Sequence, residues 1–158
     1  MCNQNPAIVK TPDKHAYHWR THNPGRVLSG ALRRFEQRVM DLMSEAGHSE
    51  TRRWHVNLTR HLDLDGTRIT DLARRSAMTN AAMNELIGQC EDMGLVERVA
   101  DPADKRARIV RFTGVGLAWL DAFGRAVAVA QQEMEDEIGS GGMTVLLKDL
   151  AGYAGSAE

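Results

Sequence analysis

Residues 95–116 read LVERVADPADKRARIVRFTGVG, and this stretch indicates the fold of the chain. Two short runs rich in β-branched residues flank a polar turn, in which Pro102 presets the backbone. In the second run, Val110 and Phe112 alternate with their neighbours, so an extended strand places both on one inward face. The stretch therefore predicts a β-hairpin with a basic tip.

Two short helices are predicted just before the hairpin. Thr67 is a suitable N-cap for a helix over 68–76, and Thr79 caps a second helix that runs to Met93. The apolar residues of the second helix recur at helical spacing, and its predicted inner face is Met83, Leu86, Ile87, Cys90 and Met93. Two capped helices followed by a hairpin form a winged helix-turn-helix, whose second helix is sized for the major groove of DNA.

Longer helices are predicted on both sides of this unit. We expect helices over 24–46, 49–62 and 114–138, and a final helix after the GSGG break at 139–142. The proposed caps are Asn23, Ser49 and Thr113. The predicted apolar stripes are Trp54, Leu58 and Leu62 in the second helix, and Leu117, Leu120, Phe123, Val127, Ala130, Met134 and Ile138 in the third. Helices with this much apolar face predict a dimer.

Residues 71–116 resemble the multiple-antibiotic-resistance regulator (MarR) family of winged helix-turn-helix repressors, whose wing reads roughly GLVER…DPxDxRxxxVxLTxxG. Phe112 stands where that family usually has leucine. The matching positions are Gly94, Leu95, Val96, Glu97, Arg98, Asp101, Pro102, Asp104, Arg106, Val110, Thr113 and Gly116. The resemblance implies a mainly α, six-helix fold with a small β-hairpin wing. It also implies a homodimer that binds a pseudo-palindromic operator in double-stranded DNA and is released by a small, often aromatic and anionic effector.

The resemblance and the helix pattern together predict four segments: an arm over 1–23, dimerisation helices and a bridge over 24–62, the winged helix-turn-helix over 63–113, and dimerisation helices over 114–158. The chain of 158 residues has a net charge of only −1. Residues after 113 carry 2 Lys or Arg against 7 Asp or Glu, so a polyanion is expected to meet the preceding segments.

Other function classes find little support in the sequence. No apolar run approaches membrane length, no secretory signal is recognisable, and two cysteines do not make a disulfide framework, so we expect a cytoplasmic protein. No catalytic triad, phosphate-binding glycine loop or redox cysteine pair is present, so we expect neither an enzyme nor a cofactor.

The predicted DNA-binding residues lie on both helices and on the hairpin. Asp104 is expected to hold the Arg106 guanidinium, because alternate residues of a strand share a face. The outward side of the second helix has amides and Glu85 but no cation; amides suit adenine and a carboxylate suits cytosine. The full set is Arg74, Arg75, Thr79, Asn80, Asn84, Gln89, Asp104, Lys105, Arg106 and Arg108. The alternative is a winged-helix interaction module with little or no specific DNA binding.

An effector site is proposed from Arg38, Arg53, Trp54 and His55, because arginine can bind a carboxylate and tryptophan can form an apolar wall. The alternative places Trp54 in the core and Arg53 in water.

Sensing residues are also weighed. The spacing of His15, His18 and His22 could suit a metal, but an arm that packs Tyr17 and Trp19 on a partner chain is favoured, and no metal is expected. Cys90 is expected to be a core residue, and a reactive role for Cys2 stays open.

Overall fold

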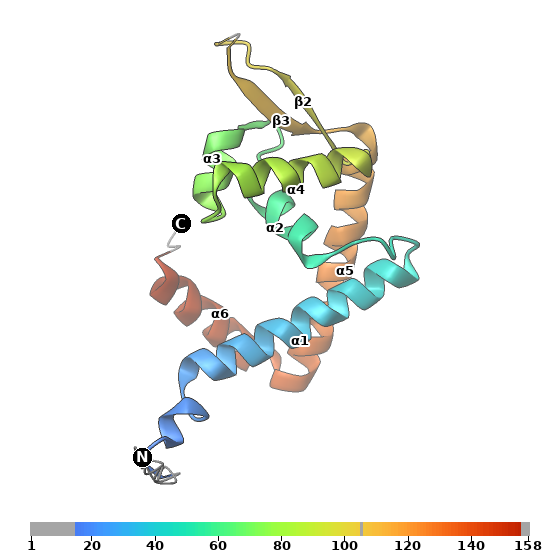
Figure 1. The fold of residues 1–158 in the computed structure, drawn as a ribbon. Helices are drawn as coiled ribbons and strands as arrows, with labels where there is room; N and C mark the ends of the chain where they lie inside the picture. Colours follow the sequence, from blue (N-terminus) through green and yellow to red (C-terminus); the bar gives the residue numbers. More distant parts are fainter. Residues whose placement is uncertain (1–14, 105, 156–158) are drawn as a thin grey trace, which may run out of the picture. The chain divides into compact units, whose positions relative to one another are not determined.

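The computed structural model describes residues 15–104 and 106–155 (Figure 1). Within these ranges the mainly helical fold with a small sheet is confirmed: six α-helices, one short 3₁₀ helix and three strands. The elements are η1 (His18–Arg20), α1 (Pro24–Glu45), α2 (Arg53–His61), β1 (Thr67–Arg68), α3 (Ile69–Arg75), α4 (Asn80–Asp92), β2 (Val96–Ala100), β3 (Arg108–Phe112), α5 (Gly114–Ile138) and α6 (Ser140–Ala154). Contacts divide the chain into a unit that ends at Arg34 and a unit that begins at Phe35.

The first unit contains η1 and the first turns of α1. The Asn23 side chain accepts a hydrogen bond from the Arg26 backbone N–H at 3.0 Å, which confirms the predicted cap. Three apolar side chains of this part of α1 are exposed: Val27, Leu28 and Leu32.

The core of the second unit lies among the helices and one face of the sheet. The strands pair antiparallel in the order β1-β3-β2, with Val96 opposite Phe112 and Thr67 opposite Val110. Val110 and Phe112 are buried, as predicted for the inward face of the hairpin. The predicted inner face of α4 is also buried at Met83, Leu86, Ile87 and Cys90, whereas Met93 is only partly buried.

The first short helix begins differently from the prediction. Thr67 does not cap it but lies in β1, where its hydroxyl accepts from the Asp63 backbone N–H at 2.9 Å and donates to the Asp63 carboxylate at 3.0 Å. The N-cap position belongs to Arg68. A strand of two residues has no sequence period, so only its pairing with β3 defines it.

Helix α2 begins at Arg53, four residues later than predicted, and Ser49 is not its cap. The preceding chain is held instead by buried Thr51, whose hydroxyl accepts from Trp119 Nε1 at 3.0 Å. The predicted stripe of α2 is also wrong at Trp54, which is 52% exposed. The buried residues of α2 are His55, Val56, Leu58 and Thr59.

Helix α5 buries a face that is shifted from the predicted stripe, which is correct at Ala130. Its buried residues are Gly116, Trp119, Ala122, Ala126 and Ala130, whereas Leu117 and Ile138 are exposed. The reason is that the indole N–H of Trp119 reaches Thr51, and the small residues that follow at helical spacing let other elements pack closely. Leu120, Phe123 and Val127 are partly buried against the same core.

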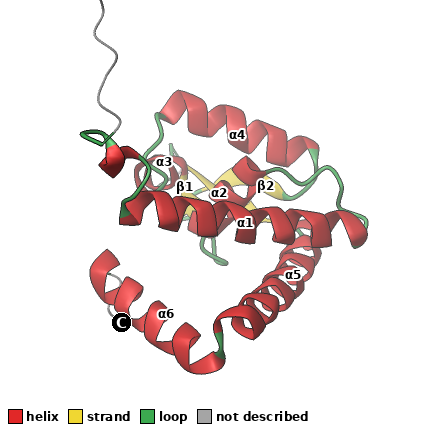
Figure 2. Ribbon diagram, turned by 90° about the horizontal axis from the view of Figure 1, so that it is seen from below, coloured by secondary structure: helices red, strands yellow, loops and turns green. Residues whose placement is uncertain are grey.

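The break after α5 is shorter than predicted. Gly139 has a φ of +88°, and α6 begins at the next residue, so the rest of GSGG is helical. Figure 2 shows α6 leaving the end of α5 in a new direction. None of the helices in residues 15–104 and 106–155 combines the length and the apolar character needed to span a bilayer.

Candidate nucleic-acid interface

Helix α4 presents a polar face that has no cation. The Thr79 hydroxyl accepts from the Ala82 backbone N–H at 3.1 Å, which confirms the predicted cap. The predicted outward residues Asn80, Asn84 and Gln89 are exposed, as is Glu85. Because amide groups carry donors and acceptors together, this face can pair with base edges without supplying net positive charge.

An arginine of β2 is bonded to the middle of α4. Arg98 Nη2 donates to the carbonyl oxygen of Asn84 at 3.0 Å, and Arg98 Nη1 pairs with Glu91 at 2.6 Å. The Asn84 side-chain amide itself donates to the carbonyl oxygen of Asn80 at 2.8 Å. Asn84 is therefore held at its backbone and at its amide, while its side-chain oxygen and second amide hydrogen stay available.

The turn of the hairpin is built on two aspartates. The Asp101 carboxylate accepts from the Ala103 N–H at 2.8 Å, and the Asp104 carboxylate accepts from the Arg106 backbone N–H at 3.0 Å. The expected contact of Asp104 with the Arg106 guanidinium is not the one formed. Asp104 lies in a turn, where its carbonyl accepts from Ala107 N–H at 2.8 Å, so the alternation of an extended strand does not apply.

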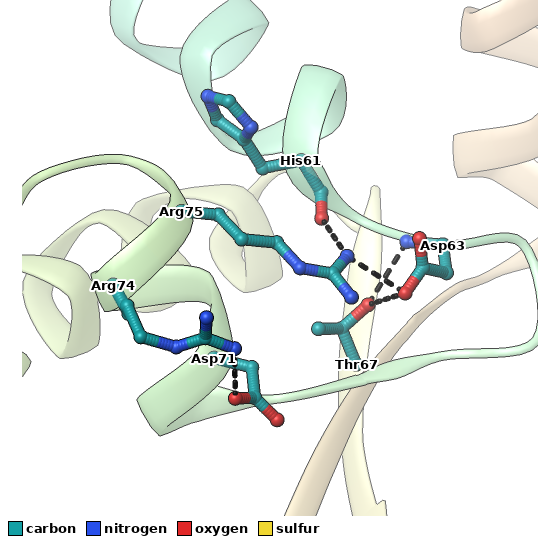
Figure 3. A network of polar contacts seen from close by, with 6 residues as sticks. All are labelled: His61, Asp63, Thr67, Asp71, Arg74 and Arg75. Carbon is teal, nitrogen blue, oxygen red and sulfur yellow. Dashed lines mark hydrogen bonds and ion pairs between the residues drawn. The ribbon is translucent and has the colours of Figure 1, made fainter. Parts of the chain in front are cut away.

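Several predicted DNA-binding arginines already have acidic partners (Figure 3). Arg74 pairs with Asp71 at 2.8 Å. Arg75 pairs with Asp63 at 2.8 Å and donates to the carbonyl of His61 at 3.1 Å. These hydrogen bonds hold the pKa of both carboxyl groups below their usual range. The positive charges of Arg74 and Arg75 are therefore largely compensated within the protein.

Two of the predicted DNA-binding cations, both near the hairpin tip, have no acidic partner among the described residues. Arg111 on β3 pairs with Glu97 at 2.8 Å. Arg106 and Arg108 are exposed, and neither forms an ion pair with another described residue. Lys105, the third predicted cation of the tip, lies outside the described residues.

Sequence reasoning missed Arg68. Its Nε donates to the Asp101 carboxylate at 2.6 Å, although the two residues are 33 positions apart. Asp101 is buried, and the pKa of its carboxyl lies below its usual range because of the Ala103 N–H and the Arg68 guanidinium. No local pattern marks this pair, since only the sheet brings β1 beside the hairpin.

The proposed effector residues are only partly grouped. Arg53, Trp54 and His55 follow one another at the start of α2, but Arg38 is bound by Glu133 of α5 at 2.8 Å. That bond raises the pKa of Arg38 above its usual range and lowers that of Glu133. The Arg38 guanidinium is therefore already occupied by an anion.

The other residues at the start of α2 differ in exposure. Arg53 lies 3.7 Å from Glu36, and Trp54 is exposed, so the alternative that placed Trp54 in the core is wrong. His55 is buried, and its Nδ1 accepts from the Arg52 backbone N–H at 3.1 Å. Burial, followed by the nearby Arg52 charge, lowers the pKa of His55.

Two histidines of the first unit, His18 and His22, stack on each other. The rings of His18 and His22 have centroids 3.6 Å apart, and His22 Nδ1 lies 2.8 Å from the Thr21 hydroxyl. Tyr17 and Trp19 are exposed. Across the part of the chain that the structure describes, no three His, Cys, Asp or Glu side chains are grouped as a metal site requires.

Only one of the two cysteines, Cys90, lies among the described residues. Cys90 is fully buried on α4, as predicted, and burial together with Glu91 raises the pKa of its thiol to about 12. Cys2 lies outside the described residues.

The winged unit matches a known family. Residues 57–107, which include α3, α4, β2 and the turn of the hairpin, match the sequence model of the MarR family. Over this stretch the chain is similar to the MarR family. No curated protein matches it significantly in sequence.

Solved MarR-type structures share the fold. Apo MarR from E. coli is 18% identical and superposes with a TM-score of 0.68 over 84% of this chain and 97% of that one. The repressor CouR bound to a 23-mer DNA duplex is 22% identical, with a TM-score of 0.68 over 86% and 95% of the two chains. CouR from Rhodococcus jostii RHA1 bound to p-coumaroyl-CoA is 19% identical, with a TM-score of 0.67 over 85% and 93%.

Proposed function

We propose that the protein is a dimeric, DNA-binding transcriptional regulator of the cytoplasm and not an enzyme. One observation carries the proposal: the exposed amide face of α4 and the unpaired arginines of the hairpin tip, Arg106 and Arg108, belong to one winged helix-turn-helix. In this fold the helix enters the major groove, and the wing follows phosphates or enters the adjacent minor groove. A structural relative of the chain, CouR, has been seen bound to DNA.

We propose further that the protein is a repressor released by a small ligand. The structural similarity of this chain to CouR, which has been seen bound to p-coumaroyl-CoA, supports an effector site. Within this chain, the exposed Trp54 offers an apolar wall for an aromatic anion. Arg53 beside it offers a cation only if the anion competes with Glu36, which lies 3.7 Å away. Arg38 can join such a site only if the anion displaces Glu133.

The dimer would use apolar side chains that the monomer leaves exposed. On α6 these include Val145 and Leu147, and on α1 they include Leu28 and Leu32. Val145→Glu together with Leu147→Glu should convert the dimer to a monomer in sedimentation velocity, with an unchanged far-UV spectrum. Leu120 and Phe123 are unsuitable for this test, because they pack against the core of their own chain.

The operator should be read without a guanine contact from α4. Bidentate guanine readers are Arg and Lys, and neither type occurs in Asn80–Asp92. Asn84, held by Asn80 and Arg98, is suited to adenine. We therefore expect selection from a randomised DNA library to give half-sites with a preferred adenine. Asn84→Ala should weaken the preference for adenine at that position. Any preference for guanine at other positions should not change when residues of α4 are substituted.

The direct test is fluorescence anisotropy with DNA from upstream of the protein's own gene. Arg106→Ala should weaken binding strongly, because it removes an unpaired cation from the hairpin tip. Arg111→Ala is the matched control, since Arg111 lies on the same hairpin but already pairs with Glu97. Equal losses in both variants would show that the tip has no special role. Each phosphate neutralised should add about 0.9 to the negative log–log salt slope.

A second candidate, an interaction module with little specific DNA binding, is favoured by one observation. Five arginines of the winged helix-turn-helix already form ion pairs with carboxylates of the protein: Arg68, Arg74, Arg75, Arg98 and Arg111. Anisotropy that stays unchanged with every DNA at low salt would support this candidate over the regulator.

A further inference from the structure

The hairpin is tied to the body of the winged unit by one ion pair with unequal exposure. Asp101 ends the β2 side of the hairpin, and its side chain is only 8% exposed, whereas that of Arg68 is 45% exposed. The Nε–carboxylate distance of 2.6 Å is typical of a charge-assisted hydrogen bond. An arginine on β1 thus holds a buried carboxylate of the hairpin.

Asp101 is also the residue on which the turn is built. Its backbone N–H donates to Ala107 O at 3.1 Å, and its carbonyl accepts from Asp104 N–H at 3.3 Å. Its second carboxylate oxygen accepts from Ala103 N–H at 2.8 Å. A shift in the position of Asp101 therefore changes the hydrogen bonds with which the turn begins.

Strand pairing by itself gives β1 little hold on the hairpin. The register joins only Thr67 to Val110 and Arg68 to Ile109, both well before the tip. Beyond Ala100 and Arg108 the hairpin has no third strand beside it among the described residues. The Arg68 side chain is the contact that extends from β1 toward the turn.

We propose that Arg68 is the positioning residue of the wing: through Asp101 it fixes the direction of the hairpin tip, and hence of Arg106 and Arg108, relative to α4. This inference rests on the proposed function for its consequence in DNA binding. Fixing the tip before binding reduces the ordering cost that a free hairpin would incur on the DNA. A pair of this kind differs from Arg111–Glu97, in which both partners are exposed.

The first test is a mutant cycle measured by anisotropy on the selected operator. Arg68→Ala should weaken binding about tenfold in the wild-type background, as expected for a coupled positioning contact. In an Arg106→Ala/Arg108→Ala background the same change should have an effect of less than about twofold, because the groups that it positions are gone. Arg68→Lys, which keeps the charge but loses the planar fork, should recover only part of the affinity.

The second test is hydrogen exchange of the free protein, which needs no DNA. In Arg68→Ala the amides of Ala103, Asp104 and Ala107 should exchange several-fold faster, whereas those of α4 should not change. Arg111→Ala is the control and should leave the turn amides unchanged.

The outcomes separate the two proposals. Additive losses in the mutant cycle would overturn the positioning role, since Arg68 would then contact DNA itself. Unchanged exchange at the turn would overturn it as well. If the wild type binds no DNA at all, the proposed function fails. Faster exchange of the turn amides in Arg68→Ala would still establish that Arg68 positions the hairpin.

Discussion

Gly116→Ala is the substitution whose cost is most clearly set by the geometry. A Cβ at Gly116 would lie 1.8 Å from the carbonyl oxygen and 2.8 Å from the carbonyl carbon of Leu95. Both are backbone atoms, so no side-chain rotation relieves the clash. Because carbon and oxygen in contact lie about 3.3 Å apart, α5 and the chain at Leu95 would have to separate by about 1.5 Å.

That separation would disrupt a local hydrogen-bond network. Thr113 N–H donates to the Leu95 carbonyl at 3.1 Å, and the Thr113 hydroxyl donates to Gly94 O and accepts from Gly116 N–H. Overpacking costs about 1–3 kcal/mol, and a lost hydrogen bond costs about 1 kcal/mol more. The helical preference for alanine returns about 1 kcal/mol. The net loss is about 3 kcal/mol at the upper end of overpacking.

The assay is thermal unfolding followed by circular dichroism. For a chain of this size, a loss of about 3 kcal/mol corresponds to a Tm lowered by roughly 6–12 °C. Gly124→Ala is the matched control in the same helix, because a Cβ there meets nothing within 4 Å. It should raise stability by up to about 1 kcal/mol. If Gly116→Ala unfolds within about 2 °C of the wild type, the close approach of α5 to Leu95 is not as described.

Three further predictions concern buried groups. Trp119→Phe should cost about 2 kcal/mol in chemical denaturation by orphaning the buried Thr51 hydroxyl, while Trp54→Phe at an exposed site should cost little; equal costs would contradict the assigned burial. Since the folded pKa of His55 lies below its ordinary 6.5, its contribution to stability is complete above pH 6.5 and is lost as the pH falls through the folded value. The wild type minus His55→Gln difference in unfolding free energy should follow this curve, and a flat difference would refute it. In a Cys2→Ser background the native protein should resist a thiol reagent until it unfolds, because Cys90 is buried with a pKa of about 12; prompt labelling would count against this.

The winged unit could be predicted because its signals are local. The hairpin is marked by alternation at Val110 and Phe112 and by the turn at Pro102, and α4 is marked by its cap at Thr79 and by apolar residues at helical spacing. Each signal spans only a few residues, so it needs no knowledge of the rest of the chain. The same locality identified Arg106 as a candidate at the tip.

The buried faces of α2 and α5 required the tertiary structure. Both helices have apolar residues on more than one side, so periodicity does not select a face. The choice came from one long-range contact, Trp119 with Thr51, which buries the smaller residues of α5 and leaves Leu117 exposed. The exposure of Trp54 follows from the position of α2 in the packed unit.

The sequence by itself determined the order of the six helices and the hairpin, the caps of α1, α4 and α5, and the exposed polar face of α4, because these depend on neighbours within one or two turns. Only the tertiary structure decided which cations remain available. Arg75 and Arg111 look equivalent to Arg106 along the chain, but folding brings each beside a carboxylate that is 12 or 14 residues away. Arg74 differs, because its partner Asp71 lies three residues earlier on the same helix. It also joins Arg68 to Asp101, since a contact across 33 residues exists only when the strands have paired.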